Sequence, residues 1–388
     1  MRQSQHSTPE LQRRVEKNEC SSSYRFFIAA MGPGEIGQGM AFARYALSHG
    51  NFVALSVPQD EYLPLIHLRH PKFSSLIIKD STALKKTLNS KKVDILVLCN
   101  SKIFTRNDNF HKHPPEPKLP SLSIDSNWLF GPSSLYLSNP WVDRYCLNLP
   151  EPIFQMGLKK NGGHYRIPKE ILKKISVVGL IPSYHPLFSQ EKNKIRTHYG
   201  VHKNEKLIFL YTSIGYLIKP VVFLKAYAVA KKLRAKGKKV KVIYFGDPPP
   251  ASLNTKDRHW FLTFPHTNTE HFSKVLASSD LVFQHQGLST LEQAIGAQVP
   301  VISNVKDPKY EKHPKRHMHA WEVGPFAKYG ACAMFFFDDS SDAIANCAED
   351  ILFNKKRREA MRRKQRALYE KGEEKVYNEA IKLLKTKS

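Results

Sequence analysis

Residues 280–303, DLVFQHQGLSTLEQAIGAQVPVIS, constrain the fold more than any other stretch of the chain. An apolar run leads into a small-residue turn at 287–290, then a helical stretch, then a second apolar run at 300–303. This order predicts a strand, a tight turn, a helix and a strand. Free backbone N–H groups and hydroxyl donors at the start of that helix suit a phosphate.

The N-terminal part of the chain begins in the same way. An apolar strand at 24–30 runs into a glycine-rich turn and a helical pattern closed by Gly50, and a strand at 52–57 follows. Strand and helix signals then alternate through SLIIKD, a helix near Leu84, VDILVLCN and SLSIDSNWLF. This alternation predicts an α/β fold with a parallel sheet covered by helices on both faces.

A second series of the same kind follows a proline-bounded connector near 177–186. It contains a strand at 207–211 and a helix at 222–236. We therefore expect two Rossmann-like domains facing a cleft, with no assigned element between Leu129 and Gly163. The expected parts are a mobile tail at 1–22, a first domain at 23–180, a linker at 181–205, a second domain at 206–370 and a C-terminal helix at 371–388.

Charge limits the partners that the surface attracts. Lys and Arg number 60 against 34 Asp and Glu, a formal charge of +26. Such a surface attracts nucleic acid, anionic lipid or phosphorylated substrates. The absence of a zinc-finger spacing or an aromatic RNA-binding signature argues against nucleic acid.

Cysteine usage and hydropathy bear on the compartment. Five scattered cysteines without CxxC spacing argue against a disulfide framework and against a zinc site. No run of eighteen apolar residues exists, and the first residues do not resemble a secretory signal. We expect a cytoplasmic protein, with peripheral attachment to the inner face of a membrane left open.

The glycine-rich loop near residue 32 allows two interpretations. Gly32, Gly34 and Gly37 match the dinucleotide fingerprint, which would favour an NAD-dependent oxidoreductase. The second strand, however, ends in LSV rather than in a ribose-binding acid, and the nearest acid is Asp60.

The segment at 280–303 resembles the donor-binding motif of two-domain (GT-B) glycosyltransferases. That group holds the UDP-sugar transferases and the lipid-linked peptidoglycan GlcNAc-transferase. His285, Gly287, Thr290 and Pro300 fall on its motif positions. Two positions depart from the motif: Gln293 stands where a ribose-binding Glu is expected, with Glu292 one place early, and Gln298 stands where a glycine is expected.

The resemblance implies a donor site spread over the second domain. Ser213 and Gly215 match a diphosphate loop in outline, and Phe264 lies where the nucleobase is contacted. His319 and Glu322 fall on positions of the sugar-recognition helix. The implied donor-binding residues are Ser213, Gly215, Phe264, His285, Gly287, Ser289, Thr290, Glu292, Gln293, His319 and Glu322.

The same resemblance makes Gly32, Gly34 and Gly37 an acceptor loop. Glu35 holds the place of the family's histidine, which serves as the catalytic base or lies beside it. Glu35 could accept a proton or simply cap the helix. Asp125, at the end of the strand SLSID, is a second candidate base, with a solvated turn residue as the alternative.

The implied reaction is an inverting transfer from a UDP-sugar to an acceptor hydroxyl, with a lipid-linked or glycan acceptor. No Asp-x-Asp motif is present, so no metal and no further cofactor are expected. The histidines at 313, 317 and 319 are interpreted as part of a basic loop. A non-catalytic relative, a sugar-nucleotide epimerase and an oxidoreductase remain alternatives.

Overall fold

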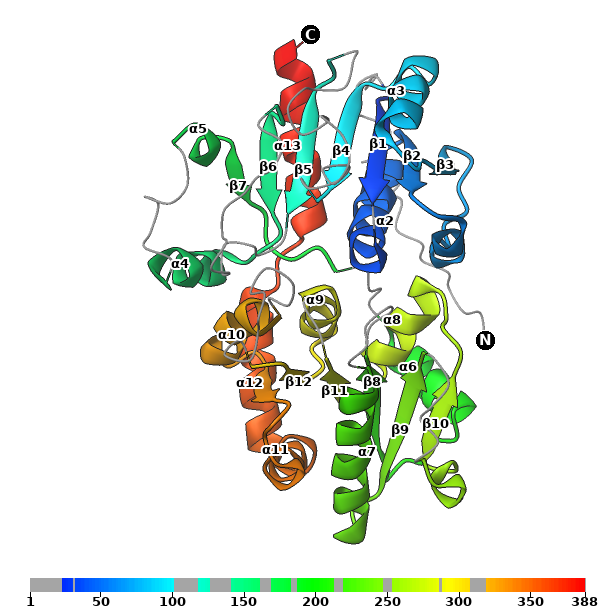
Figure 1. Cartoon of the computed structure of the whole chain (residues 1–388), viewed down its shortest axis with the longest axis vertical. Helices are drawn as coiled ribbons and strands as arrows, with labels where there is room; N and C mark the ends of the chain where they lie inside the picture. Colours follow the sequence, from blue (N-terminus) through cyan, green and yellow to red (C-terminus); the bar gives the residue numbers. More distant parts are fainter. Residues whose placement is uncertain are drawn as a thin grey trace, which may run out of the picture.

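The computed structural model describes residues 23–30, 32–100, 118–125, 141–160, 169–182, 187–212, 219–246, 253–285, 288–307 and 319–387. These residues form two α/β domains, one above the other in Figure 1, each built on a parallel sheet. The structure confirms the predicted pair of Rossmann-like domains.

The first domain carries, over its described residues, a seven-stranded sheet in the order β3-β2-β1-β4-β5-β6-β7. Strands from the interior of a parallel sheet are buried on both faces, which explains their continuous apolar runs. The strands are β1 (Arg25–Ala30), β2 (Phe52–Val57), β3 (Phe73–Ile77), β4 (Ile95–Cys99), β5 (Ser121–Asp125), β6 (Arg144–Leu147) and β7 (Ile175–Val177). The helices are α2 (Pro33–Ser48), η1 (Asp60–Leu65), α3 (Ser81–Ser90), α4 (Glu151–Lys160) and α5 (Lys169–Leu172).

The second domain carries a six-stranded sheet, again counted over described residues, in the order β10-β9-β8-β11-β12-β13. Its strands are β8 (Lys206–Tyr211), β9 (Val240–Phe245), β10 (Phe261–Phe264), β11 (Leu281–Gln284), β12 (Val301–Val305) and β13 (Ala333–Phe336). Its helices are α6 (Ser189–His198), α7 (Lys219–Ala235), η5 (Thr255–Asp257), α8 (Thr269–Ala277), α9 (Leu288–Ala297), α10 (His319–Tyr329), α11 (Ser341–Phe353) and α12 (Lys355–Leu368).

Both sheets reverse their strand order beside their first strand. β1 lies between β2 and β4, and β8 lies between β9 and β11. In an open parallel sheet this reversal creates a crevice at the carboxyl ends of the strands. Helices α2 and α9 contact each other across the domain interface, so the two crevices face one another (Figure 1).

The chain crosses between the domains twice, at 178–182 and at 369–372, and the two crossings touch. The N–H of Gly372 donates to the carbonyl of Leu180 over 3.0 Å. A Cβ at position 372 would clash with that carbonyl oxygen, so only glycine fits the contact. Beyond the crossing, α13 (Gly372–Lys387) packs on α2, β5 and β6 of the first domain.

Two stretches hold elements that the sequence did not reveal. β6 and α4 form within 129–163, where several prolines and aromatic residues obscure the periodicity. The expected linker contains α6, which packs against α8. Because α6 is mostly polar, it gives little apolar signal; it begins where Glu191 accepts a hydrogen bond of 3.0 Å from the N–H of Phe188. None of the described helices is long and apolar enough to cross a membrane.

Candidate functional site

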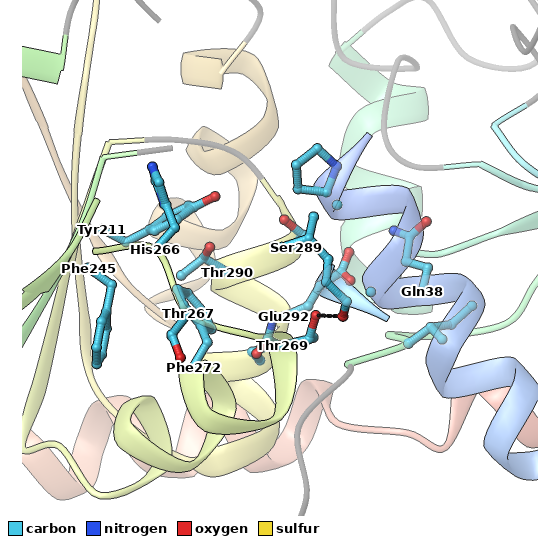
Figure 2. Close-up of a pocket in the computed structure, with 16 residues that line it drawn as sticks. Gln38, Tyr211, Phe245, His266, Thr267, Thr269, Phe272, Ser289, Thr290 and Glu292 are labelled. Atoms are coloured by element: carbon cyan, nitrogen blue, oxygen red, sulfur yellow. Dashed lines mark hydrogen bonds between the residues drawn. The ribbon is translucent and has the colours of Figure 1, made fainter. Parts of the chain in front are cut away.

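A cleft that encloses about 680 Å³ of empty space, part of it open to solvent, lies between the two domains. Figure 2 shows side chains of both domains around it. The first domain contributes the start of α2, the end of η1 and the first crossing segment. The second contributes the ends of β8 and β9, the loop after β10, and the starts of α8 and α9. The cavity therefore occupies the facing crevices.

Aromatic side chains form the wall on the second domain. Tyr211 ends β8, Phe245 ends β9, and Phe272 lies on α8. The rings of Tyr211 and Phe272 meet edge to face with centroids 5.2 Å apart. His266 and Thr267 add polar groups from the loop after β10 (Figure 2). An aromatic wall with a few polar groups suits a planar heterocycle such as a nucleobase.

The first turn of α9 forms another part of the wall. Ser289 and Thr290 line the cavity there, and the turn contains no acidic residue. Gly34 of α2 lies opposite: a Cβ added to it would be 3.3 Å from Ser289 Oγ. Unpaired N–H groups and the helix dipole give such a helix start a partial positive charge. With two hydroxyl donors beside it, this wall suits an anionic group such as a diphosphate.

Two hydrogen bonds join the domains beside the cavity. Asn148, directly after β6, donates through Nδ2 to Glu292 Oε1 of α9 over 2.8 Å. Thr269 of α8 donates through Oγ1 to the carbonyl oxygen of Leu65 at the end of η1, also over 2.8 Å (Figure 2). Leu65, Thr269 and Glu292 all line the cavity. The bonds therefore hold walls from different domains together.

Glu292 is the one acid among the described residues that line the cavity, and its pKa is strongly shifted. Burial raises its pKa from 4.5 to about 8, and the nearby Glu322 raises it further, while Asn148 and Gln38 oppose the shift. Glu292 is only 1% exposed. It is therefore mostly a neutral carboxylic acid at pH 7.

Four of the predicted donor-site residues lie together on α9: Ser289, Thr290, Glu292 and Gln293 all line the cavity. The neighbouring side chains of Glu292 and Gln293 point in different directions. Glu292 faces the first domain, whereas Gln293 accepts a hydrogen bond of 2.8 Å from Ser273 Oγ of α8 through its Oε1. Gln293 thus lies beside the second-domain wall of the cavity.

Three other predicted residues are not among those lining the cavity. His285 follows β11, is 1% exposed, and has its Nδ1 3.0 Å from the carbonyl oxygen of Asn304. Phe264 is half-buried, with its ring centroid 5.6 Å from that of Phe245. Glu322 lies on α10, close enough for its charge to raise the pKa of Glu292.

The structure does not describe the side chains of the four remaining predicted donor residues. Ser213, Gly215 and Gly287 are not among the described residues, and His319 begins α10 without a described side chain. The histidines at 313 and 317 also lie outside the described ranges. Over the ranges that are described, no cluster of three or more His, Cys, Asp or Glu could hold a metal ion.

The two candidate bases lie at the crevice of the first sheet but do not line the cavity. Asn100 donates through Nδ2 to Glu35 Oε1 over 3.3 Å, and burial raises the pKa of Glu35. Asp125 ends β5, is 1% exposed and accepts a hydrogen bond from Ser123 Oγ. Burial raises the pKa of the Cys99 thiol, at the end of β4, and the negative charges of both carboxyls raise it further. Both carboxyls therefore lie near the same edge of the sheet. Asn100 itself has φ 122°, an unusual value for a residue other than glycine.

The three loop glycines have different surroundings. A Cβ on Gly32 would be 2.7 Å from Glu35 Oε2, and Gly34 faces Ser289. Gly37 lies within α2 and lines the cavity. A side chain at either position would therefore have to displace a neighbouring side chain, Glu35 at position 32 or Ser289 at position 34.

Sequence reasoning missed much of the cavity wall. Tyr211 and Phe245 could have been found, because each ends a predicted strand and the carboxyl ends of parallel strands meet at one edge. The other missed residues of the wall carry no local signal; they are Pro33, Gln38, Leu65, Ile181, His266, Thr267, Thr269 and Phe272. Asn148, which bonds Glu292 beside the cavity, was missed for the same reason.

Two parallel α/β domains with facing switch-point crevices define the GT-B fold. No protein-family model matches the sequence, and no curated protein matches it. Solved structures do resemble it.

A Listeria monocytogenes protein assigned as a UDP-N-acetylglucosamine 2-epimerase has a TM-score of 0.56 and 13% identity, over 88% of this chain and 91% of that one. CalG4, the calicheamicin glycosyltransferase, has a TM-score of 0.60 and 13% identity, over 93% of this chain and 98% of that one. Arabidopsis thaliana UGT89C1 complexed with quercetin has a TM-score of 0.64 and 11% identity, over 94% of this chain and 99% of that one. At such identities the likeness shows the GT-B fold alone.

Proposed function

We propose that this protein is a glycosyltransferase that moves a sugar from a UDP-sugar to an acceptor hydroxyl, with inversion and without a metal ion. The observation that carries the proposal is the cavity, which combines an aromatic wall with a helix start. A nucleoside diphosphate has both parts, a planar base and an anionic diphosphate. The name of the Listeria structure supports a UDP-sugar ligand, and the name of CalG4 supports glycosyl transfer.

In this proposal the base lies against Tyr211 and Phe245, and the diphosphate lies at the start of α9. Ser289 and Thr290 bind the phosphate oxygens. The helix start and these donors stabilise the charge that develops as UDP leaves. Metal independence rests on the lack of an Asp-x-Asp motif in the sequence.

Chemistry requires a base on the acceptor side. The acceptor oxygen attacks the anomeric carbon, its proton passes to Glu35 or Asp125, and the bond to the UDP oxygen breaks. Burial raises the pKa of Glu35, which brings it closer to the working pH of a general base. The strongly basic surface supports an acceptor held at an anionic membrane surface in the cytoplasm.

The structure favours this proposal over an NAD-dependent oxidoreductase. A dinucleotide would need its pyrophosphate at the start of α2, where Gly34 instead faces Ser289 of α9. A sugar-nucleotide epimerase shares the fold and needs no acceptor. It would release no UDP when an acceptor is added.

Calorimetric titration with UDP, GDP, dTDP and NAD, with and without EDTA, tests the proposal. We expect UDP to bind and binding to survive EDTA. Binding of NAD alone would move the function to the first glycine loop, and no binding would favour a non-catalytic protein. UDP release that depends on an added acceptor would then separate transfer from epimerisation.

A matched pair of variants tests the anion site. Thr290→Val keeps the shape of a cavity residue but removes its hydroxyl, so UDP affinity should fall about tenfold, the effect of one lost hydrogen bond to a charged group. Thr87→Val makes the same change on α3, away from the cavity, and should leave UDP affinity unchanged. Equal affinities of the two variants would contradict the anion site.

A further inference from the structure

We propose that Asn148 and Glu292 form a latch that positions the two domains around the cavity, and that the latch holds while Glu292 carries its proton. The pair are positioning residues, because they act through the placement of the cavity walls. The inference uses the proposed function only where UDP serves as a probe.

The latch is a continuous chain of buried hydrogen bonds. Asn148 is 0% and Glu292 1% exposed, and the bond between them spans the domain interface. Asn148 Oδ1 also accepts a hydrogen bond of 2.8 Å from the N–H of Ile181, on the first crossing segment. Ile181 itself lines the cavity. The chain therefore runs from α9 through the end of β6 to the segment that joins the domains.

The surroundings of Glu292 make its charge state matter. Its second oxygen, Oε2, is buried and makes no hydrogen bond with any residue that the structure describes. Burial, the largest effect, and the charge of Glu322 on α10 raise the pKa of this carboxyl, whereas Asn148 and Gln38 of α2 lower it. An ionised Glu292 would thus be a buried charge facing another acid, which is costly. The neutral acid keeps the bond from Asn148 without that cost.

Domain opening would expose Glu292 to water and restore its ordinary pKa. The pKa is about 8 in the closed form and 4.5 when solvated. The closed form therefore holds the proton more tightly. Its advantage is fully present below pH 4.5 and is lost progressively as pH rises toward about 8.

Closure also completes the cavity. Gly34, Gln38 and Ile181 come from the first domain or the crossing segment, whereas the aromatic wall and α9 belong to the second domain. A ligand that touches both walls binds the closed form more tightly and shifts the population toward it. Loss of the latch should therefore weaken ligand binding.

Small-angle scattering on the full chain at pH 6 and pH 9, with and without UDP, tests the latch. Glu292→Gln keeps the acceptor for Asn148 but cannot ionise. Asn148→Ala removes the donor. Asn51→Ala is the matched control: Asn51 is 2% exposed and bonds the carbonyl oxygen of Ala46 and Tyr377 Oη within the first-domain core, away from the interface.

We expect the radius of gyration of the UDP-free wild type to rise between pH 6 and pH 9, and that of Glu292→Gln to stay at the compact value. Asn148→Ala should be expanded already at pH 6 and bind UDP about tenfold more weakly, as for one lost buried hydrogen bond. Asn51→Ala should follow the wild type in both measurements.

Two results would overturn the latch: a wild-type radius that does not change with pH, or the same radius for Asn148→Ala and Asn51→Ala. Failure of UDP to bind the wild type would overturn the proposed function instead. In that case the scattering of the UDP-free proteins still decides whether the latch exists.

Discussion

Replacing Glu292 with glutamine should stabilise the protein against unfolding at neutral pH. Burial raises the pKa of Glu292 from 4.5 to about 8, so the folded chain keeps a proton that the unfolded chain releases. The stability contributed by this group is present below pH 4.5 and is lost as pH rises toward 8. At pH 7, 2.5 units above 4.5, the loss amounts to about 3 kcal/mol at about 1.4 kcal/mol per unit. Glutamine has nearly the same shape and never ionises, so it avoids this loss.

Urea unfolding of the wild type and Glu292→Gln at pH 5 and pH 7.5 measures the effect. The stability gap between the two proteins should widen by about 3 kcal/mol over this interval. Glu61→Gln, an exposed substitution in η1, serves as the control and should give a gap that does not depend on pH. A gap for Glu292→Gln that is equal at the two pH values would refute the reasoning, because it would mean that the carboxyl is not desolvated.

Other substitutions test separate parts of the structure. Gln298 directly follows α9 and has φ 56°, so Gln298→Gly should raise the free energy of unfolding by about 1 kcal/mol, measured by urea titration. Gly372→Ala should lower the melting temperature, because its Cβ would clash with the first crossing segment. Gly34→Leu should force α2 from α9 and weaken UDP binding in calorimetry by about tenfold. If Glu35 is the base, Glu35→Gln should lower kcat by at least about a hundredfold while Asp125→Asn retains activity; the reverse would assign Asp125.

The sequence was sufficient for the fold because its signals are local. The strand at 281–284, the small-residue turn and α9 lie within one short stretch, and the same pattern recurs near residue 30. Hydrophobic runs and turn residues fix such units largely by themselves. The sequence also showed Gln298 where the motif has a glycine. The structure explains why the motif has glycine there: the backbone at 298 has a positive φ, which glycine adopts without strain.

The candidate site could be predicted only in part from the sequence. Ser289, Thr290 and Gln293 were identified from the motif and do line the cavity. Glu292 stood out in the sequence as an acid one position early, but a sequence cannot show which way neighbouring helix residues point until the helix is packed. The structure turns Glu292 toward the first domain and Gln293 toward α8.

What the sequence alone determined is the pair of α/β domains and the turn that begins α9, because strand and helix patterns depend on residues close in the chain. Only the tertiary structure decided how the two crevices meet. Asn148 and Glu292 are 144 positions apart, and Leu65 and Thr269 are 204 apart. Their hydrogen bonds, the burial of Glu292 and its raised pKa arise because the two domains exclude water where they meet.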